Sequence, residues 1–283
     1  MTQLIDGKVI AESIKEKIKL EVQSLNPPPR LDVILVGNND ASEIYVKKKG
    51  EACSEVGFNF QCHHLKESEQ YKLFRLVENL NIDYKTNGIL VQLPLPEGWD
   101  CNRIFGLINP NKDVDVFHPE NIGLLVQNEP RFLPPTPRAV QQIFEWSKLS
   151  LVGKHVVIIN RSLVVGKPLS SMLIQDNGVY ANATVTVCHN NTPPEILKQI
   201  CLSADIIIVA VGIPGFLTED MVTKSQVIID VGITRVGKKI FGDVHPAVLQ
   251  KVSYATPVPG GVGPVTVACL LQNVLEVRKF YYE

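Results

Sequence analysis

The sequence predicts an α/β protein of two domains, an N-terminal α/β lobe and a Rossmann-type domain with a parallel sheet, with a cleft between them. Two observations predict this class. Short apolar runs alternate with amphipathic helical segments along almost the whole chain, which is typical of parallel sheets covered on both faces. A proline-rich stretch over residues 128–137 interrupts the alternation and indicates a domain boundary. The chain has 283 residues, 45% of them hydrophobic, and is therefore long enough for two cores.

The N-terminal lobe is expected to comprise residues 1–138 and 265–283. Apolar residues at helical spacing predict a helix over 6–25, which the prolines at 27–29 end. Further helices are expected at 42–56, 68–80, 100–108, 119–126 and 265–282, and strands at 31–36, 58–65 and 88–92. The last of these helices is expected to return to this lobe from the end of the chain.

The second domain is expected over residues 139–264. A helix over 139–149 leads into strands at 156–159, 184–187, 206–209 and 227–230, with helical segments between them. A loop dense in proline and glycine follows at 257–264. This order is typical of a Rossmann nucleotide-binding unit.

Composition argues against several classes of protein. A net charge of −1 provides no basic excess for a nucleic-acid partner. The start of the chain lacks the pattern of a signal peptide, and the longest apolar run, near 204–213, is too short to span a membrane. The six cysteines include no Cys-x-x-Cys pair and are typical of thiols in a cytoplasmic protein. We therefore expect a cytoplasmic protein without a membrane or nucleic-acid partner.

The strand at 156–159 runs into a loop and then a helix, with Gly166 in the loop and Pro168 suited to the first helical turn. Such an arrangement aims backbone N–H groups and the positive end of a helix at a phosphate. Because the motif G-x-G-x-x-G is absent, a plain turn between strand and helix is an alternative interpretation.

The end of the second strand of this domain favours NADP over NAD. An NAD enzyme usually places Asp or Glu there to bind the ribose 2′-hydroxyl, but residues 188–192 contain no carboxylate. Arg161 and Ser162 in the first loop could instead bind a 2′-phosphate through charge-assisted hydrogen bonds. His189 and Asn190 fit a polar turn equally well.

Tyr45 and Lys49 lie four residues apart on a predicted helix and therefore share one face. A lysine beside an apolar or aromatic surface loses hydration, so that its pKa falls and it becomes suited to proton transfer. Spacing alone favours an ordinary surface lysine, because buried lysines are rare.

Three further segments are candidates for ligand contacts. Gln92 ends a buried strand, where ligands collect in parallel sheets, and could bind substrate, position Lys49 or cap the strand. Asp113 and Asp115 could accept two hydrogen bonds from an amino-pyrimidine ring or simply form a turn, and this short pattern predicts no metal site. The loop at 256–264 could be a ligand-facing wall or a connector.

Together these segments resemble the bifunctional methylenetetrahydrofolate dehydrogenase/cyclohydrolase family. The Tyr-x-x-x-Lys pattern, the sequence VQLPLP and the sequence TPVPGGVGP form a highly specific combination. The matching segments follow the family's order over nearly the whole chain: 42–49, 88–96, 112–115, 161–168, 183–186, 230–233, 242–244 and 256–266.

The resemblance implies two reactions of one-carbon metabolism. NADP⁺ oxidises 5,10-methylenetetrahydrofolate to the 5,10-methenyl cation, and water opens this cation to 10-formyltetrahydrofolate. Lys49 is the implied proton-transfer residue and Gln92 tunes it, while Tyr45 packs along the folate and Asp115 anchors the pterin. The implied substrate-binding residues are Tyr45, Lys49, Val91, Gln92, Leu93, Asp115, Pro259, Gly260 and Gly261. The implied NADP contacts are Asn160, Arg161, Ser162, Asn190 and Ile233, and the family leads us to expect a homodimer.

The chain departs from the family pattern at four positions. Val116 replaces a glycine, and because β-branched residues avoid positive φ, we expect the turn that holds Asp115 to differ. Asn160 also replaces a glycine, although asparagine tolerates a positive φ better than most residues. Pro135 replaces a cysteine, and Asn190 replaces a frequent serine. Two alternatives stay open: an NADP-dependent oxidoreductase acting on a small acid, and a folate- or nucleotide-binding regulator without turnover.

Overall fold

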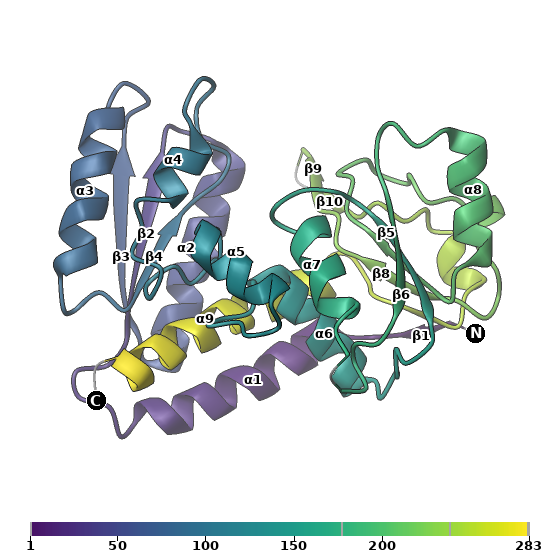
Figure 1. The fold of residues 1–283 in the computed structure, drawn as a ribbon, viewed down its shortest axis with the longest axis horizontal. Helices are drawn as coiled ribbons and strands as arrows, with labels where there is room; N and C mark the ends of the chain where they lie inside the picture. The colour runs from purple at the N-terminus through teal and green to yellow at the C-terminus, as the bar shows by residue number, and fades with distance from the viewer. Residues whose placement is uncertain (1, 177, 238, 282–283) are drawn as a thin grey trace. The chain divides into compact units, whose positions relative to one another are not determined.

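The computed structural model describes residues 2–176, 178–237 and 239–281 (Figure 1). The chain divides into two compact units, each made of discontinuous segments. The first, called here the N-terminal unit, comprises Glu12–Pro135 and Val267–Glu283; the second, the Rossmann unit, comprises Met1–Ala11 and Thr136–Thr266. The expected division differs from this one mainly at the start, where residues 1–11 join the Rossmann unit.

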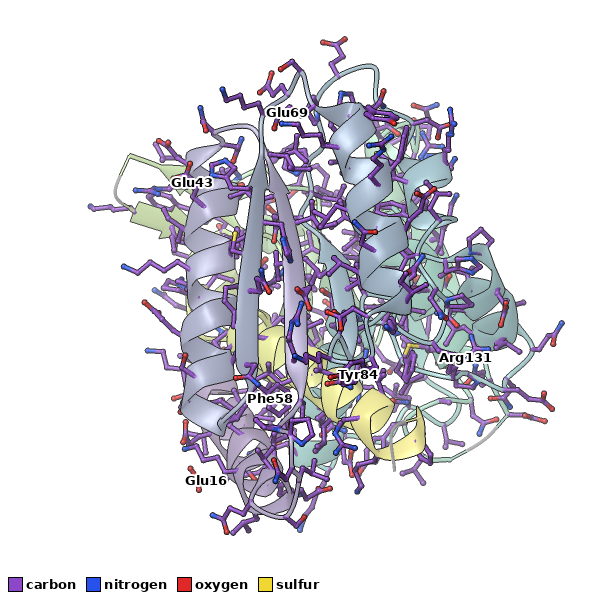
Figure 2. The ribbon with its side chains drawn as sticks, turned by 90° about the vertical axis from the view of Figure 1, so that its left-hand side faces the viewer. Glu16, Glu43, Phe58, Glu69, Tyr84 and Arg131 are labelled. Carbon is purple, nitrogen blue, oxygen red and sulfur yellow. The ribbon has the colours of Figure 1, made fainter. Side chains whose placement is uncertain are left out.

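The N-terminal unit contains a three-stranded parallel sheet in the order β3-β2-β4. The strands are β2 (Arg30–Val36), β3 (Asn59–Leu65) and β4 (Gly88–Val91), as the sequence predicts. Helix α2 (Asp40–Val56) and helix α3 (Gln70–Ile82) lie on opposite sides of these strands (Figure 2). In the same view Glu43 and Glu69 mark the end of the sheet where β2 and β3 finish, and Phe58 and Tyr84 mark the opposite end.

Side chains along each strand point alternately to the two faces of the sheet, so every second residue packs against the helices on one face. Ile34 and Val36 of β2 join Ile89 and Val91 of β4 in one buried cluster with α3 and the short helix α4 (Cys101–Phe105). The other helices with residues in this unit are α1 (Gly7–Val22), α5 (Pro119–Val126) and α9 (Val262–Tyr281).

The Rossmann unit contains a six-stranded sheet in the order β1-β11-β8-β7-β5-β6, in which all neighbouring strands are parallel. Its strands are β1 (Gln3–Leu4), β5 (His155–Ile159), β6 (Thr184–Cys188), β7 (Ile206–Val209), β8 (Val227–Asp230) and β11 (Tyr254–Ala255). The four longer strands confirm the prediction. The pairing of β1 with β11 was not predicted, and it explains why residues 1–11 belong to this unit.

Helix α6 (Pro135–Trp146) leads into β5, while α7 (Gly166–Leu173) connects β5 to β6 and α8 (Pro194–Ser203) connects β6 to β7. The unit also contains a hairpin of β9 (Thr234–Val236) and β10 (Lys239–Phe241), and 3₁₀ turns η1 (Glu219–Met221) and η2 (Val248–Gln250). Helix α6 begins four residues earlier than predicted, inside the proline-rich stretch. Proline is tolerated in the first helical turn, because N–H groups there have no hydrogen-bond partner within the helix. None of the helices in the described part of the chain is long and apolar enough to cross a membrane.

Candidate active site

The lysine predicted from the sequence lies on α2, where it meets the end of β4. Asn39 caps α2 by accepting a hydrogen bond from the Ser42 N–H (3.0 Å), and Gly57 ends the helix in the left-handed conformation. Lys49 and Tyr45 are both partly buried. The Lys49 Nζ donates to Gln92 Oε1 at 2.9 Å. The structure therefore brings together two side chains that lie 43 residues apart in the chain.

Gln92 is held in a single orientation. Its backbone N–H continues the sheet by donating to Ile34 O (2.9 Å), and its side-chain Nε2 donates to Leu93 O (2.8 Å). Because the amide nitrogen is engaged in this way, the amide oxygen faces Lys49. Leu93 is partly buried, whereas Val91 is buried in the core cluster beneath the sheet.

Electrostatics at this lysine favour its neutral form. Burial lowers the pKa of Lys49, while the nearby Asp115 carboxylate opposes that shift by favouring the ammonium. Burial also raises the pKa of the Cys53 thiol to about 12, so that this neighbour is uncharged at neutral pH. The neutral amine is therefore more accessible at Lys49 than at a solvated lysine.

Asp115 is presented by a turn whose other polar side chains are occupied. Lys112 donates to Leu80 O (2.9 Å) and Asp83 O (2.8 Å). Asp113 accepts hydrogen bonds from the N–H groups of Phe117 (3.1 Å) and His118 (2.8 Å) and from Asn121 Nδ2 (2.9 Å). In contrast, no hydrogen bond to the Asp115 carboxylate is found among the described residues. Burial raises the pKa of Asp115 to about 6, and the carboxylate is available for a ligand.

Val116 follows Asp115 and takes a left-handed backbone conformation, which is unexpected for a β-branched residue. Its φ is 63°, in the left-handed region, and its side chain is fully buried. The premise that a valine avoids this conformation does not hold at this position, and a difference between this turn and that of the family stays a prediction. Burial of the valine and the three hydrogen bonds accepted by Asp113 hold a conformation that costs a non-glycine residue roughly 1–3 kcal/mol.

The loop after β5 is organised by Asn160. Its Oδ1 accepts hydrogen bonds from the N–H groups of Ser162 (2.8 Å) and Gly166 (2.9 Å) and from Ser162 Oγ (2.8 Å). A side chain on Gly166 would overlap the Asn160 carbonyl, so α7 can begin there only with glycine. Ser162 Oγ also accepts from Val165 N–H (3.1 Å), and its hydroxyl is therefore used within the loop.

Arg161 extends from this loop to the end of the neighbouring strand. Its Nη2 donates to Asn190 Oδ1 at 2.6 Å, and both side chains are exposed to a ligand. The segment after β6 contains no carboxylate that would repel a 2′-phosphate. A cavity of about 400 Å³ opens beside it, lined by His189, Asn190, Thr192, Pro194, Leu197, Lys198, Phe216, Thr218, Asp220 and Met221. This donor set fits NADP, and Ile233 lies at the same edge of the sheet, after β8.

The proline-glycine loop packs against the start of α1. Gly7 N–H donates to Gly260 O (2.9 Å), and a side chain on Gly7 would overlap the Gly261 carbonyl. Gly260 has a φ of 107°, which only glycine adopts readily. These contacts hold the loop against the start of α1, and α9 begins directly from it at Val262.

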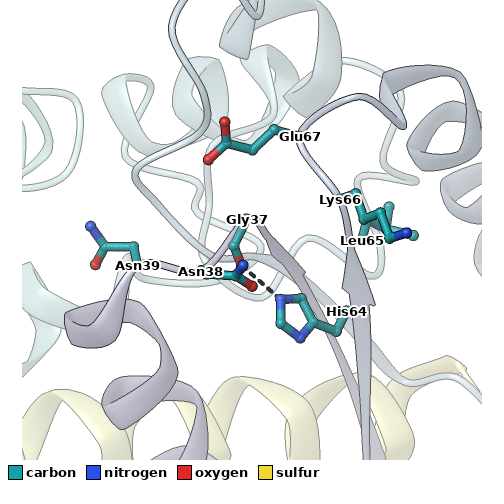
Figure 3. A pocket seen from close by; sticks show the side chains of 7 residues that line it. All are labelled: Gly37, Asn38, Asn39, His64, Leu65, Lys66 and Glu67. Atoms are coloured by element: carbon teal, nitrogen blue, oxygen red, sulfur yellow. Dashed lines mark hydrogen bonds between the residues drawn. The ribbon is translucent and has the colours of Figure 1, made fainter.

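A cavity of about 610 Å³ lies in the N-terminal unit at the ends of β2 and β3 (Figure 3). His64 Nε2 donates to Gly37 O there at 2.6 Å. None of the residues predicted to bind a ligand lines this cavity, which is bounded by Gly37, Asn38, Asn39, His64, Leu65, Lys66 and Glu67.

A partly buried lysine held by an amide in one unit and an arginine-bearing strand-end loop in the other are the features of a two-domain, nucleotide-dependent dehydrogenase. The chain belongs to the tetrahydrofolate dehydrogenase/cyclohydrolase family. The family's catalytic domain matches residues 5–115, and its NAD(P)-binding domain matches residues 134–281.

Similar proteins cover nearly the whole chain. The bifunctional protein FolD of Sulfurihydrogenibium sp. is 47% identical, with 98% of this chain and 97% of that protein covered. The bifunctional methylenetetrahydrofolate dehydrogenase/cyclohydrolase structure from Campylobacter jejuni is 43% identical over 99% of both chains, with a TM-score of 0.93. The Trypanosoma brucei enzyme, solved with NADP and an inhibitor, is 34% identical over 98% of this chain and 97% of that one, with a TM-score of 0.91.

Family membership confirms the activity predicted from the sequence. The chain is an NADP-dependent methylenetetrahydrofolate dehydrogenase and methenyltetrahydrofolate cyclohydrolase. The two alternatives, an oxidoreductase of small acids and a regulator without turnover, are not supported. Sequence reasoning missed Cys53, although it lies four residues after Lys49 on the same helical face, and it missed the roles of Lys112 and Asp113 in presenting Asp115.

Proposed function

We propose that Lys49 is the proton-transfer residue of the hydrolytic step and that Gln92 orients it. The observation that carries the proposal is the 2.9 Å hydrogen bond between Lys49 Nζ and Gln92 Oε1, together with the lowered pKa of Lys49. NADP⁺, when bound, accepts the hydride that converts the methylene group to the methenyl cation. The cation would lower the pKa of Lys49 further, because like charges repel.

Hydrolysis then requires a base and an acid at the same place. Water adds to the carbon between N5 and N10, and neutral Lys49 accepts a proton from that water. The ammonium so formed returns a proton to N5 as the bond between carbon and N5 breaks, and the hydroxyl on the same carbon loses its proton to solvent. This leaves a neutral formyl group on N10 and releases one proton overall. One lysine of suitable pKa performs both transfers.

Binding roles follow from the remaining groups. Asp115, whose carboxylate has no partner among the described residues, is proposed to accept two hydrogen bonds from the amino-pyrimidine edge of the pterin. Tyr45, one helical turn from Lys49, is proposed to pack along the folate. Arg161 and Asn190 are proposed to bind the 2′-phosphate of NADP. The contacts proposed for Pro259, Gly260 and Gly261 stay predictions from the family pattern.

The decisive variant is Lys49→Met, which keeps a long, unbranched side chain and removes the amine. We expect the rate of hydrolysis of supplied methenyltetrahydrofolate, measured as the decay of the methenyl absorbance, to fall at least about 100-fold, the lower end of the range for general acid–base catalysis. Lys48→Met is the matched control, because Lys48 is exposed and adjacent. A Lys49→Met enzyme with full hydrolytic turnover would show that the lysine has no such role.

We further propose a cytoplasmic homodimer. Six free cysteines, four of them buried, support a reducing compartment, and the family pattern supports the dimer. Light scattering on the eluting peak of a sizing column measures the mass directly. A mass near 31.4 kDa, that of one chain, would contradict the dimer.

A further inference from the structure

Two buried carboxyl groups lie at the ends of β7 and β8 in the Rossmann unit, and the reaction described above does not use them. Asp230 is the last residue of β8 and is 3% exposed, and Asp243 is fully buried. Neither belongs to an ion pair in the described part of the chain. Charges buried so deeply are rare unless they have a specific task.

Asp243 holds the loop that follows β7. Its Oδ2 accepts hydrogen bonds from the backbone N–H groups of Val211 (2.6 Å) and Gly212 (3.0 Å). Its Oδ1 is buried and has no hydrogen-bond partner among the described residues. A side chain on Gly232 would overlap this carboxyl group, so the loop after β8 packs directly against it.

Asp230 holds the segment that contains Asp243. Its Oδ1 accepts from the N–H groups of Gly232 (3.0 Å) and Asp243 (3.0 Å), and its Oδ2 accepts from Val244 N–H (3.0 Å). A side chain on Gly242 would overlap Asp230 Oδ2. Through these bonds the loops after β7 and β8 and the segment 242–244 form one hydrogen-bonded unit.

These loops lie where a coenzyme is expected. Parallel strands β5, β7 and β8 are neighbours in the sheet, and ligands of such sheets bind at the carboxyl ends of the strands. Ile233, a predicted NADP contact, directly follows Gly232. A shift of the backbone at Gly232 would therefore move Ile233.

We propose that Asp243 is a positioning residue for coenzyme binding: its carboxylate fixes the loop after β7 and, together with Asp230, the loop after β8 that carries Ile233. This inference rests on the proposed coenzyme site. It predicts a role in NADP affinity that is separate from folate binding and from hydrolysis, because Lys49 and Asp115 belong to the other unit.

The test is direct titration of the purified full chain with NADP⁺ by calorimetry. Asp243→Ala removes the acceptors of both N–H groups, and we expect the Kd for NADP⁺ to rise at least about tenfold, because the loop that carries Ile233 is no longer held in place. Asp243→Asn keeps an amide oxygen for both N–H groups and is expected to stay within about threefold of the original chain. Hydrolysis of supplied methenyltetrahydrofolate without coenzyme should stay within about twofold in every variant.

Val248→Ala controls for a loss of stability alone. Val248 is fully buried in the core of the same unit, and its truncation lowers stability without removing any of the hydrogen bonds that hold the loops. If Asp243→Ala does not fold, Asp243→Ser, whose hydroxyl is too short to reach both N–H groups, is expected to give the same rise in Kd.

Two results would overturn the inference. One is a Kd for Asp243→Ala within threefold of the original; the other is an equal rise in Val248→Ala. Arg161→Ala, titrated in parallel, separates this inference from the proposed site. If Arg161→Ala weakens NADP⁺ binding and Asp243→Ala does not, only the role of Asp243 fails. An unchanged Kd in Arg161→Ala would instead reject the coenzyme site.

Discussion

Asp115 in the N-terminal unit and Asp230 in the Rossmann unit have the same electrostatic character and opposite surroundings. Burial raises the pKa of each to about 6. Asp230 accepts three backbone hydrogen bonds, whereas no hydrogen bond to Asp115 is found in the described part of the chain. Asp115 is partly exposed, and Asp230 is closed off by Gly242.

The difference separates binding from positioning. A raised pKa shows only that a carboxyl group has lost water, and it marks both residues equally. Unused acceptor capacity distinguishes them. The carboxylate of Asp115 accepts no hydrogen bond from the described residues, as the proposed ligand contact requires, while that of Asp230 holds loops.

The largest expected effect is on Asp115. In Asp115→Asn an amide NH₂ would face a pterin donor, so we expect the KM for methylenetetrahydrofolate to rise about 100-fold, from the loss of about 3 kcal/mol of charge-assisted hydrogen bonding. The Kd for NADP⁺ should not change. Steady-state kinetics measure the KM of the variant, and chemical denaturation measures its free energy of unfolding. A loss of stability with an unchanged KM would mean that Asp115, like Asp230, supports the fold and does not bind substrate.

The second effect concerns the dependence of stability on pH. The pKa of Asp230 in the folded state, about 6, exceeds its ordinary value of 3.8, so the stability linked to its protonation is present below pH 3.8 and is lost as pH rises through 6. The free energy of unfolding should fall, relative to Asp230→Asn, by up to about 3 kcal/mol between pH 4 and 7. Denaturation of both proteins across this range measures the difference, in which the contribution of Asp115 cancels. A difference independent of pH would contradict the raised pKa.

The smallest effect tests how Asp115 is presented. Val114→Gly removes a fully buried side chain and adds backbone freedom, which should reduce the free energy of unfolding by about 3 kcal/mol. Val116→Gly loses as much burial but relieves the left-handed backbone, so we expect a net loss of only about 1 kcal/mol. Equal losses in the two variants, measured by denaturant titration, would mean that Val116 is not strained.

Sequence patterns were sufficient where local rules decide the structure. Fully apolar runs predicted β5, β7 and β8, and the four-residue spacing of Tyr45 and Lys49 predicted their shared helical face. Two-residue strands such as β1 and β11 show no periodicity, because their pairing depends on residues about 250 positions apart. The placement of Asp243 could not be predicted either, since its partners come from another loop and the sequence shows only an isolated Gly-Asp-Val. Val116 takes a positive φ against its own preference because tertiary packing outweighs it.

The interleaving of the two units restricts how this chain could have been assembled or exchanged in evolution. The chain passes from one unit to the other at residues 11–12, 135–136 and 266–267, and each crossing falls within a helix: α1, α6 or α9. Recombination that replaced one unit by that of a distant relative would need three simultaneous breakpoints, each of them near the start of a helix. The two units are therefore expected to be inherited together as one block.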